Sequence, residues 1–555
     1  MATNTTLSEP PQTSWWVRHY TFTGTATGLV FIWLSLTPSL LPRGPLFQGL
    51  VSGASGAVGY GLGVFAVFLV RYMRSADSSP AAPRWAWAVL IPVAIAIHVL
   101  VVLQFRGWQR QVREMMGVPQ LVWYAFFIAA ALAVLILFVF VECGQLTRKA
   151  FRTSTRALNR VAPPRVSLVV VLALMVGLTI ALLNGVVAKV AMRTMNHTFA
   201  RIDDEVDPSL PAPTTQLRSG GPTSLVPWKS LGREGRRFVA NGPSMKELTA
   251  FNGAPATEPI RAYAGLHSAH GIKATAELAA LDLVRAGGLT RSIVAVGTTT
   301  GTGWINEAQA TALEYMYNGD SAIVSMQYSF LPSSLSFLVD KENARQAGQA
   351  LFEAVDKQIR ALPESHRPKL VVFGESLGSF GGEAPFMTLD NVLARTDGAL
   401  FSGPTFNNTI WDELTINRDP GSPQWLPIYN DGRNVRFVDR PSDLQRPHPQ
   451  WDGSPRVVYL QHASDPIAWW NLKLLLKKPD WLSEPRGYDV LPSVKWKPIV
   501  TFLQVAADMA VAVDVPDGHG HSYFADIANA WAQILRPPGW TDEKTERLRP
   551  LMHGD

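Results

Sequence analysis

The pattern of hydrophobic positions divides the chain into two halves of different character. The first 200 residues contain five long apolar runs, at 20–41, 47–70, 85–105, 121–141 and 166–187. A helix that crosses the hydrocarbon core of a bilayer needs about 20 residues, and each run is long enough. Residues 1–201 are therefore predicted to form a membrane α-helical bundle with five transmembrane helices. The second run carries small residues at four-residue and similar spacings, which favour close helix contacts and a central position in the bundle.

After residue 258 the pattern changes to short β-like runs that alternate with helical stretches. The β-like runs lie at 292–296, 322–326, 370–373, 399–401 and 457–460, and helices are expected at 307–317 and 341–362. This alternation predicts a mostly parallel sheet flanked by helices over residues 258–555. Residues 202–257, rich in Pro, Gly and Asp at their start, are expected to be a linker and entry segment.

Two stretches of this second half, 403–455 and 466–497, lack periodicity and are rich in Trp and Pro. We expect them to be insertions that cap the domain. Their aromatic side chains are expected to pack onto the core, or alternatively to line a groove for an acyl chain or lie at a membrane surface.

Charge supports the membrane assignment and suggests an orientation. The formal net charge is +6, but residues 1–201 hold 17 Lys and Arg against 4 Asp and Glu. Basic residues in the gaps between apolar runs are typical of membrane loops, not of a nucleic-acid interface. The strongly basic segment 148–165 is expected in the cytoplasm, together with the N-terminus. An odd number of helices then places residues 202–555 outside the cell membrane.

Few polar residues lie within the apolar runs, and a single cysteine is present. His98 and Asn184 are expected to make hydrogen bonds between helices, with a functional role as the alternative. Cys143 is the sole cysteine, so an intrachain disulfide is excluded.

Residues 374–378, Gly-Glu-Ser-Leu-Gly, fit the G-x-S-x-G nucleophile elbow and follow the apolar run 370–373. In this motif the serine, here Ser376, is exposed on a sharp turn from strand to helix. A serine hydroxyl becomes a nucleophile only when a base takes its proton, and a carboxylate orients that base. The sequence therefore predicts an acid and a histidine farther along the chain.

The acid and the base are sought in the order Ser, Asp, His that hydrolases with this elbow follow. Asp465 comes just after the run 457–460, with Asp508, Asp514 and Asp517 as rivals. His521, in a glycine-rich turn near the C-terminus, is the predicted base and His519 its rival. His462 is expected to be a buried core residue or a substrate contact.

An oxyanion formed at Ser376 needs preorganised hydrogen-bond donors. One donor is expected from the backbone N–H of Leu377, and the others from Thr298, Thr299 and Thr300 in the Gly- and Thr-rich loop 297–304. A phosphate site is the competing interpretation of this loop, but a Walker lysine is missing. No cofactor is expected, and no spacing of His, Asp and Glu predicts a metal site.

Several longer stretches resemble a family of bacterial membrane-bound hydrolases, alpha/beta-hydrolase family 9. They are residues 35–43, 300–304, 374–378, 398–400, 459–466 and 518–521. The resemblance implies an N-terminal multi-helix membrane domain followed by an α/β-hydrolase domain. It also implies the roles of nucleophile, acid and base for Ser376, Asp465 and His521.

These observations lead to one functional expectation and two alternatives. We expect a membrane-anchored serine esterase, lipase or acyltransferase that acts on a lipid or acylated substrate at the outer face of the cell membrane. Its partners are then the lipid bilayer and an acyl-ester substrate, with no nucleic acid; the oligomeric state stays open. The alternatives are a transporter or assembly scaffold with a hydrolase-like docking domain, and a membrane serine peptidase.

Overall fold

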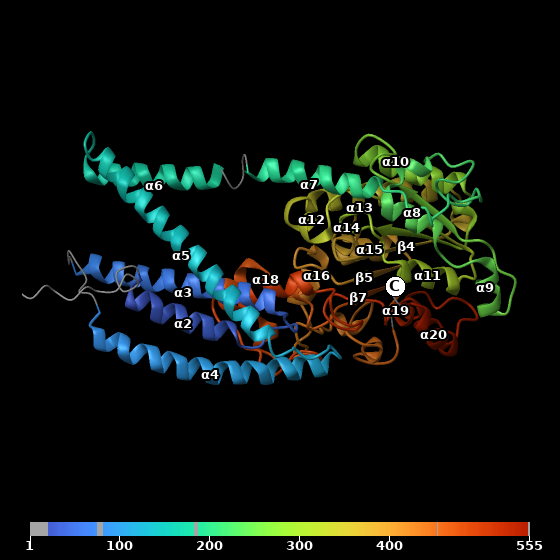
Figure 1. Ribbon diagram of the computed structural model, residues 1–555. Coiled ribbons are helices and arrows are strands. Elements are labelled where there is room, and N and C mark those ends of the chain that lie inside the picture. Colours follow the sequence, from blue (N-terminus) through green and yellow to red (C-terminus); the bar gives the residue numbers. More distant parts are fainter. Residues whose placement is uncertain (1–19, 75–81, 182–186, 452, 553–555) are drawn as a thin grey trace, which may run out of the picture. The chain divides into compact units, whose positions relative to one another are not determined.

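The computed structural model describes residues 20–74, 82–181, 187–451 and 453–552 (Figure 1). The chain forms two compact units. The first, called the helical unit here, comprises Met1–Met175 with Leu472–Lys478 and Ser493–Asp508. The second, called the sheet unit, comprises Val176–Asn471, Pro479–Pro492 and Met509–Asp555. Two short segments from the C-terminal half of the sequence thus belong to the helical unit.

Four helices of the N-terminal half are long and apolar enough to cross a membrane, among the residues that the structure describes. They are α3 (Pro45–Met73), α4 (Arg84–Met115), α5 (Ala125–Leu158) and α6 (Pro164–Ala181). Most of their apolar side chains are not covered by other parts of the chain. Exposed apolar surface on this scale requires a lipid environment, so the protein is membrane-embedded.

The prediction of five transmembrane helices is wrong, because the first predicted helix is too short to cross the membrane. The run 20–41 forms only a 14-residue helix, α2 (Phe22–Ser35), which is about 21 Å long at 1.5 Å per residue. The hydrocarbon core is about 30 Å thick. The helix stops early because Pro38 and Pro42 follow, and proline disrupts a helix interior. Asn184 lies outside the described residues.

Helix α3 packs closely against both α2 and α5, as its small residues predicted. A Cβ atom on Gly53 would lie 2.6 Å from Cβ of Ile136 on α5, and one on Gly59 would lie 2.7 Å from the ring of Phe31 on α2. Thr27 of α2 donates to the Gly59 carbonyl at 2.8 Å. These contacts allow the backbones to approach because glycine has no side chain.

The sheet unit is built on seven strands, all parallel. They lie in the order β1-β3-β2-β4-β5-β7-β6. Their bounds are β1 (Ile260–Ala264), β2 (Ile293–Thr298), β3 (Ser321–Met326), β4 (Lys369–Glu375), β5 (Gly398–Ser402), β6 (Val435–Val438) and β7 (Arg456–Leu460). The five predicted strands are confirmed.

The strands β1 and β6 escaped the sequence pattern for different reasons. In β1 the apolar run is interrupted by Arg261, which is fully buried and pairs with Glu314 at 2.7 Å. Strand β6 has four residues, too few for a periodic signal, and lies within 403–455. That stretch was expected to be an insertion throughout, which is wrong because part of it completes the sheet.

Helices cover both faces of the sheet (Figure 1). The helices α10 (Ile272–Arg285), α13 (Lys341–Arg360) and α14 (Leu377–Glu383) pack on one face, and α11 (Glu307–Met316) and α19 (Ile527–Leu535) on the other. The remaining helices are α7 (Val187–Asp204), α8 (Gly232–Ala240), α9 (Met245–Asn252), α12 (Ser333–Val339), α15 (Leu389–Arg395), α16 (Thr409–Ile416), α17 (Pro466–Trp469), α18 (Val500–Asp508, in the helical unit) and α20 (Asp542–Leu548). Because every strand is parallel, all their carboxyl ends meet at one edge, where ligands bind in such sheets.

The segment 202–257 contains packed residues as well as turns. Ser219 is fully buried, its hydroxyl donates to the Asp282 carboxylate on α10 at 2.5 Å, and it accepts from the Tyr263 N–H of β1 at 2.9 Å. This part of the segment is therefore fixed to the sheet unit.

Candidate active site

Ser376 occupies a sharp turn between β4 and α14. Its backbone has φ 57° and ψ −121°, a conformation that non-glycine residues rarely adopt. The Ser376 N–H donates to the Ser402 carbonyl at the end of β5, at 3.0 Å. Backbone strain of this kind persists where the surrounding structure holds it, commonly at functional sites. The geometry is that of the strand-to-helix elbow expected from the motif.

The two flanking glycines are required by close backbone contacts. A Cβ atom on Gly374 would lie 2.3 Å from the Gly378 carbonyl oxygen. A Cβ atom on Gly378 would lie 2.3 Å from the carbonyl oxygen of Thr298, at the end of β2. The start of α14 is therefore pressed against the loop that follows β2.

Asp465 and His521 form a buried pair. Asp465 follows β7 and caps α17 by accepting from the Ile467 N–H at 2.8 Å. Its other oxygen, Oδ2, lies 2.7 Å from His521 Nδ1, and the two side chains are 0% and 4% exposed. Because Nδ1–H donates a hydrogen bond to the carboxylate and keeps its proton, Nε2 is left as the free acceptor of the neutral ring. Among the described residues this buried Nε2 has no hydrogen-bond partner.

His521 lies beside the end of β5, the strand that accepts a hydrogen bond from the Ser376 N–H. A Cβ atom on Gly403, the residue after Ser402, would lie 2.4 Å from His521 Cε1. Gly403 has φ 52° and leaves room for the imidazole ring. The carboxyl end of β5 thus positions both Ser376, which precedes this strand in the sequence, and His521, which follows it.

The rival acids and the rival histidine lie elsewhere. His519 Nδ1 lies 3.1 Å from Asp489 Oδ2, in a separate pair. Asp508 belongs to the helical unit, where its carboxylate pairs with Arg43. Asp517 accepts from two backbone N–H groups of its own turn, and Asp514 is exposed. Of the candidate pairs, only Asp465 and His521 meet beside β5.

The N–H of Thr299, in the loop after β2, is a backbone donor close to α14. The Thr300 N–H already donates to the Trp304 carbonyl at 2.8 Å. Thr298 is still part of β2 and pairs with Gly374 of β4. In the described part of the chain no hydrogen bond is seen from the N–H groups of Thr299 and Leu377. A Cβ atom on Gly378 would be 3.3 Å from the Thr299 carbonyl, so these two donors lie in the same neighbourhood.

Glu375, the residue before Ser376, is a buried carboxyl group close to the pair. It accepts from Asn306 Nδ2 at 2.6 Å. Burial raises the pKa of Glu375 to about 7, although the His521 ring and the Asn306 hydrogen bond act against this rise. Burial by itself favours neutral His521, but the Asp465 carboxylate outweighs it and, with Glu375, raises the pKa of His521 above its usual value. The two groups are therefore electrostatically linked.

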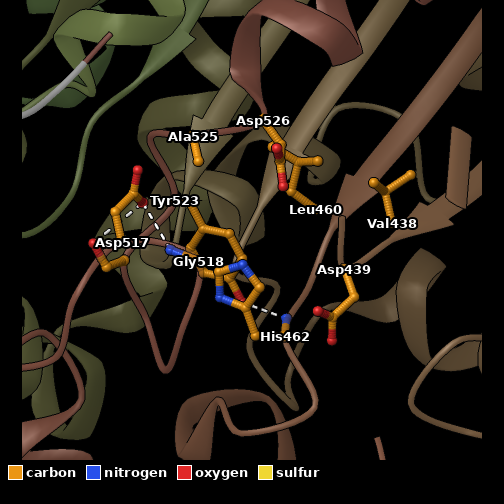
Figure 2. Close-up of a pocket in the computed structure, with 10 residues that line it drawn as sticks. Val438, Asp439, Leu460, His462, Asp517, Gly518, Tyr523, Ala525 and Asp526 are labelled. Carbon is orange, nitrogen blue, oxygen red and sulfur yellow. Dashed lines mark hydrogen bonds between the residues drawn. The ribbon is translucent and has the colours of Figure 1, made fainter. Parts of the chain in front are cut away.

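Tyr523 connects the Asp465–His521 pair to His462. This histidine is buried and hydrogen-bonded, as expected if it is a core residue. The Tyr523 hydroxyl donates to Asp465 Oδ2 at 2.8 Å and accepts from the His462 N–H at 3.0 Å. The His462 ring stacks on the Tyr523 ring at 4.2 Å (Figure 2). Its Nδ1 lies 3.0 Å from the Gly520 carbonyl. Burial lowers the pKa of His462, which keeps the ring neutral.

Sequence reasoning did not single out Tyr523, Glu375 or Gly403. Tyr523 follows His521 by two residues and Glu375 lies inside the elbow motif, but neither position has a residue type that a motif requires. No grouping of His, Cys, Asp and Glu side chains suited to a metal ion occurs in the described ranges.

Comparison with known families covers both halves of the chain. The profile of the alpha/beta-hydrolase family matches residues 260–548, and the profile of the N-terminal region of that family matches residues 36–243. The searches of curated proteins and of solved structures returned no match. The two profiles together match most of the chain, over the parallel sheet as well as the apolar helices. The chain belongs to the alpha/beta-hydrolase family.

Proposed function

We propose that this protein is a membrane-embedded serine hydrolase with Ser376 as nucleophile, His521 as base and Asp465 as the acid that orients the base. One observation carries the proposal. His521 is held by Asp465 through Nδ1, and its Nε2 is buried, free, and placed by the same strand end as the strained Ser376. A buried acceptor without a hydrogen-bond partner destabilises the folded state. Its presence is explained if it serves to bind another group, here the serine hydroxyl.

In the proposed reaction the Ser376 Oγ attacks an acyl carbonyl while its proton passes to His521 Nε2. Asp465 stabilises the imidazolium that forms. The C–O bond to the leaving alcohol then breaks, and the alcohol takes the proton from His521. A water molecule, or an acceptor hydroxyl in the case of acyl transfer, repeats the sequence on the acyl-enzyme and releases Ser376.

The oxyanion of this reaction is assigned to the N–H groups of Leu377 and Thr299. Both lack another partner in the described chain, and Leu377 begins the helix that follows the nucleophile. Preorganised donors of this kind stabilise charge that appears only in the transition state. Among the three predicted threonines, Thr299 is favoured because the N–H of Thr300 is used and Thr298 lies within the ladder.

We assign a lipid ester as the substrate class, because the catalytic chain is fused to apolar helices. A lipid in the bilayer is reached without being extracted, which would expose acyl chain to water at a cost of about 0.8 kcal/mol per CH₂ group. Ester hydrolysis or acyl transfer is therefore favoured over peptide cleavage.

The sheet unit is assigned to the outer side of the cell membrane. The end of α5, the turn after it and the start of α6 hold the basic run from Arg148 to Arg165, which favours the cytoplasm. Among the described residues, α6 is the one helix after this run that is long and apolar enough to cross the membrane, so the chain that follows is assigned to the outside whether or not α2 spans. With four spans the N-terminus also lies outside, in contrast to the position expected from five.

Labelling with a fluorophosphonate probe tests the proposed nucleophile. The wild-type protein is expected to be labelled, and Ser376→Ala should lose both the label and at least about a thousandfold of its activity on a fluorogenic acyl ester. Ser365→Ala, an exposed serine in the same unit, serves as the control and keeps both. An unlabelled wild-type protein, or equal labelling of Ser376→Ala, would exclude this mechanism.

The side of the membrane is tested with single cysteines in a Cys143→Ala background. A membrane-impermeant maleimide added to intact cells should modify Ser365→Cys in the sheet unit. It should modify Ser154→Cys, in the basic end of α5, only after the cells are opened. The reverse pattern would place the catalytic residues in the cytoplasm.

A further inference from the structure

The helical unit contains an apolar cleft that the proposed reaction does not use. It has a volume of about 310 Å³ and is lined by residues of α2, α3, α4 and α5. This volume is at the lower end of the range of small-molecule sites, about 300–1,000 Å³. The cleft extends along α4 from His98 to Phe105, about 10 Å at 1.5 Å per residue.

The cleft faces the region where lipid chains lie. Among its lining side chains, Val99 and Leu103 of α4 and Phe127 of α5 are 53%, 60% and 68% exposed, so the cleft is open at the side. Two of the lining residues, Phe105 and Phe126, contact each other edge to face, with ring centroids 6.0 Å apart. Because these helices are embedded in a bilayer, the solvent at this opening is hydrocarbon.

One of the residues that line the cleft has a polar atom that needs a donor. Gln48, on α3, is 2% exposed and its Nε2 donates to Ser52 Oγ at 2.9 Å and to the Ser35 carbonyl at 3.3 Å. The Gln48 Oε1 atom is buried and has no partner among the described residues. An acceptor buried away from water is stabilised only when a donor reaches it.

We propose that this cleft binds a fatty acid, with its chain along α4 and its protonated carboxyl group donating to Gln48 Oε1. The ester groups of a glycerolipid contain only acceptors and cannot satisfy this atom. Burial in a low-dielectric site favours the protonated form of a carboxyl group, and this form can donate. A single chain also suits a cleft of this volume better than the two chains of a glycerolipid.

The proposal goes beyond the hydrolase reaction and does not depend on it. The site lies entirely within the helical unit and includes none of the residues proposed for acyl transfer.

Photocrosslinking of the full-length protein in lipid nanodiscs tests the site. The probe is palmitic acid with a diazirine in the middle of its chain, and the modified peptides are mapped by mass spectrometry. Modification is expected on α4 around His98–Phe105 and on α5 around Phe126–Ala133. Unlabelled palmitic acid should compete at least fivefold more strongly than methyl palmitate, which has the same chain but no donor.

Matched variants separate the cleft from general contact with lipid. Ala130→Trp fills the cleft and should lower the crosslinking at least fivefold. Val134→Trp, four residues along α5 and 67% exposed, lies outside the lining and should leave it unchanged. Val102→Trp, which fills the cleft from α4, is the second variant if Ala130→Trp does not fold, as judged by gel filtration. Gln48→Met should abolish the preference for the acid over the methyl ester.

Two results would overturn the proposal. One is modification spread evenly over α3–α6 and unchanged by both cleft-filling variants. The other is equal competition by palmitic acid and methyl palmitate. The same measurements on Ser376→Ala should agree with the wild type, so a failure of the hydrolase mechanism would not change this result.

Discussion

At the scale of single residues, the site depends on how its titratable groups affect one another. Asp465 holds the His521 ring and raises its pKa, and Tyr523 holds Asp465 from the other side. Glu375 adds a further carboxyl group whose pKa is raised to about 7 by burial. The pKa of the proposed base, His521, therefore depends on two carboxyl groups. One of these, Glu375, changes its charge near neutral pH.

A pH profile tests this link at Glu375. His521 must be neutral to accept the serine proton, so activity is expected to rise with pH through the His521 pKa. In Glu375→Gln the negative charge that favours the protonated ring is gone, so the rising limb of kcat/KM should move to lower pH. Hydrolysis of a fluorogenic acyl ester between pH 5 and 9 measures the limb.

The exposed residue Glu364 provides the matched control. Glu364→Gln removes the same charge far from the elbow and should leave the limb in place. A limb that stays unchanged in Glu375→Gln, or that moves to higher pH, contradicts the proposed coupling.

At the scale of elements, glycines determine how closely helices and strands pack against one another. In the sheet unit, Gly378 lets α14 approach the end of β2, and in the helical unit α3 meets α5 through Gly49 and Gly53. Each contact is short enough that an added Cβ atom would collide with backbone or with the Cβ of a neighbour. These glycines are spaced along their helices so that each lies on the contact face.

The pair Gly53 and Gly61 tests this role within one helix. A Cβ atom on Gly53 would lie 2.6 Å from Ile136 Cβ, whereas one on Gly61 meets nothing within 4 Å. Gly53→Leu should destabilise the helical unit by about 1–3 kcal/mol, because the helices cannot separate without losing other contacts. Gly61→Leu should change the stability by less than about 0.5 kcal/mol. Thermal unfolding in detergent measures both, and equal effects would argue against close packing of α3 and α5.

At the scale of the whole molecule, the chain between the proposed acid and base contributes to the helical unit. Residues Leu472–Lys478 and Ser493–Asp508 lie between Asp465 and His521 in sequence and belong to that unit. The end of α18 is fixed there by Asp508, whose Oδ1 lies 3.2 Å from Arg43 Nε with both side chains fully buried. Its Oδ2 accepts from the Leu40 N–H at 3.1 Å and from the Ser39 hydroxyl.

This buried ion pair predicts an asymmetry between single and double variants. Arg43→Met leaves a buried carboxylate without its partner and should destabilise the helical unit by about 3–5 kcal/mol. Arg43→Met combined with Asp508→Leu removes both charges and should recover most of that loss. Trypsin cleavage at Lys495, which is exposed, should be faster in the single variant than in the double.

A surface pair serves as the control for this experiment. Arg110 and Glu114 lie 2.7 Å apart with side chains 72% and 55% exposed, so Arg110→Met should change the stability by less than about 1 kcal/mol. If Arg43→Met behaves like Arg110→Met, the buried pair does not hold α18.

The order of the elements and the positions of the candidate residues could be predicted from the sequence. Long apolar runs, short β-like runs and the elbow around Ser376 are local patterns, and local patterns follow from side-chain periodicity and turn chemistry. The same reasoning proposed Asp465 and His521 because each follows a recognisable signal along the chain. The first apolar run does not form a spanning helix, because its apolar residues continue past Pro38 whereas the helix ends at Ser35.

Only the tertiary structure decided which groups meet. Asp465 rather than Asp508 lies beside His521, and His519 pairs with Asp489, because the sheet order and the turns bring those side chains together. The burial that raises the pKa of Glu375 and leaves Gln48 Oε1 without a partner also depends on contacts between residues far apart in sequence. Periodicity along a chain specifies elements, but desolvation and hydrogen bonding between elements exist only once they pack.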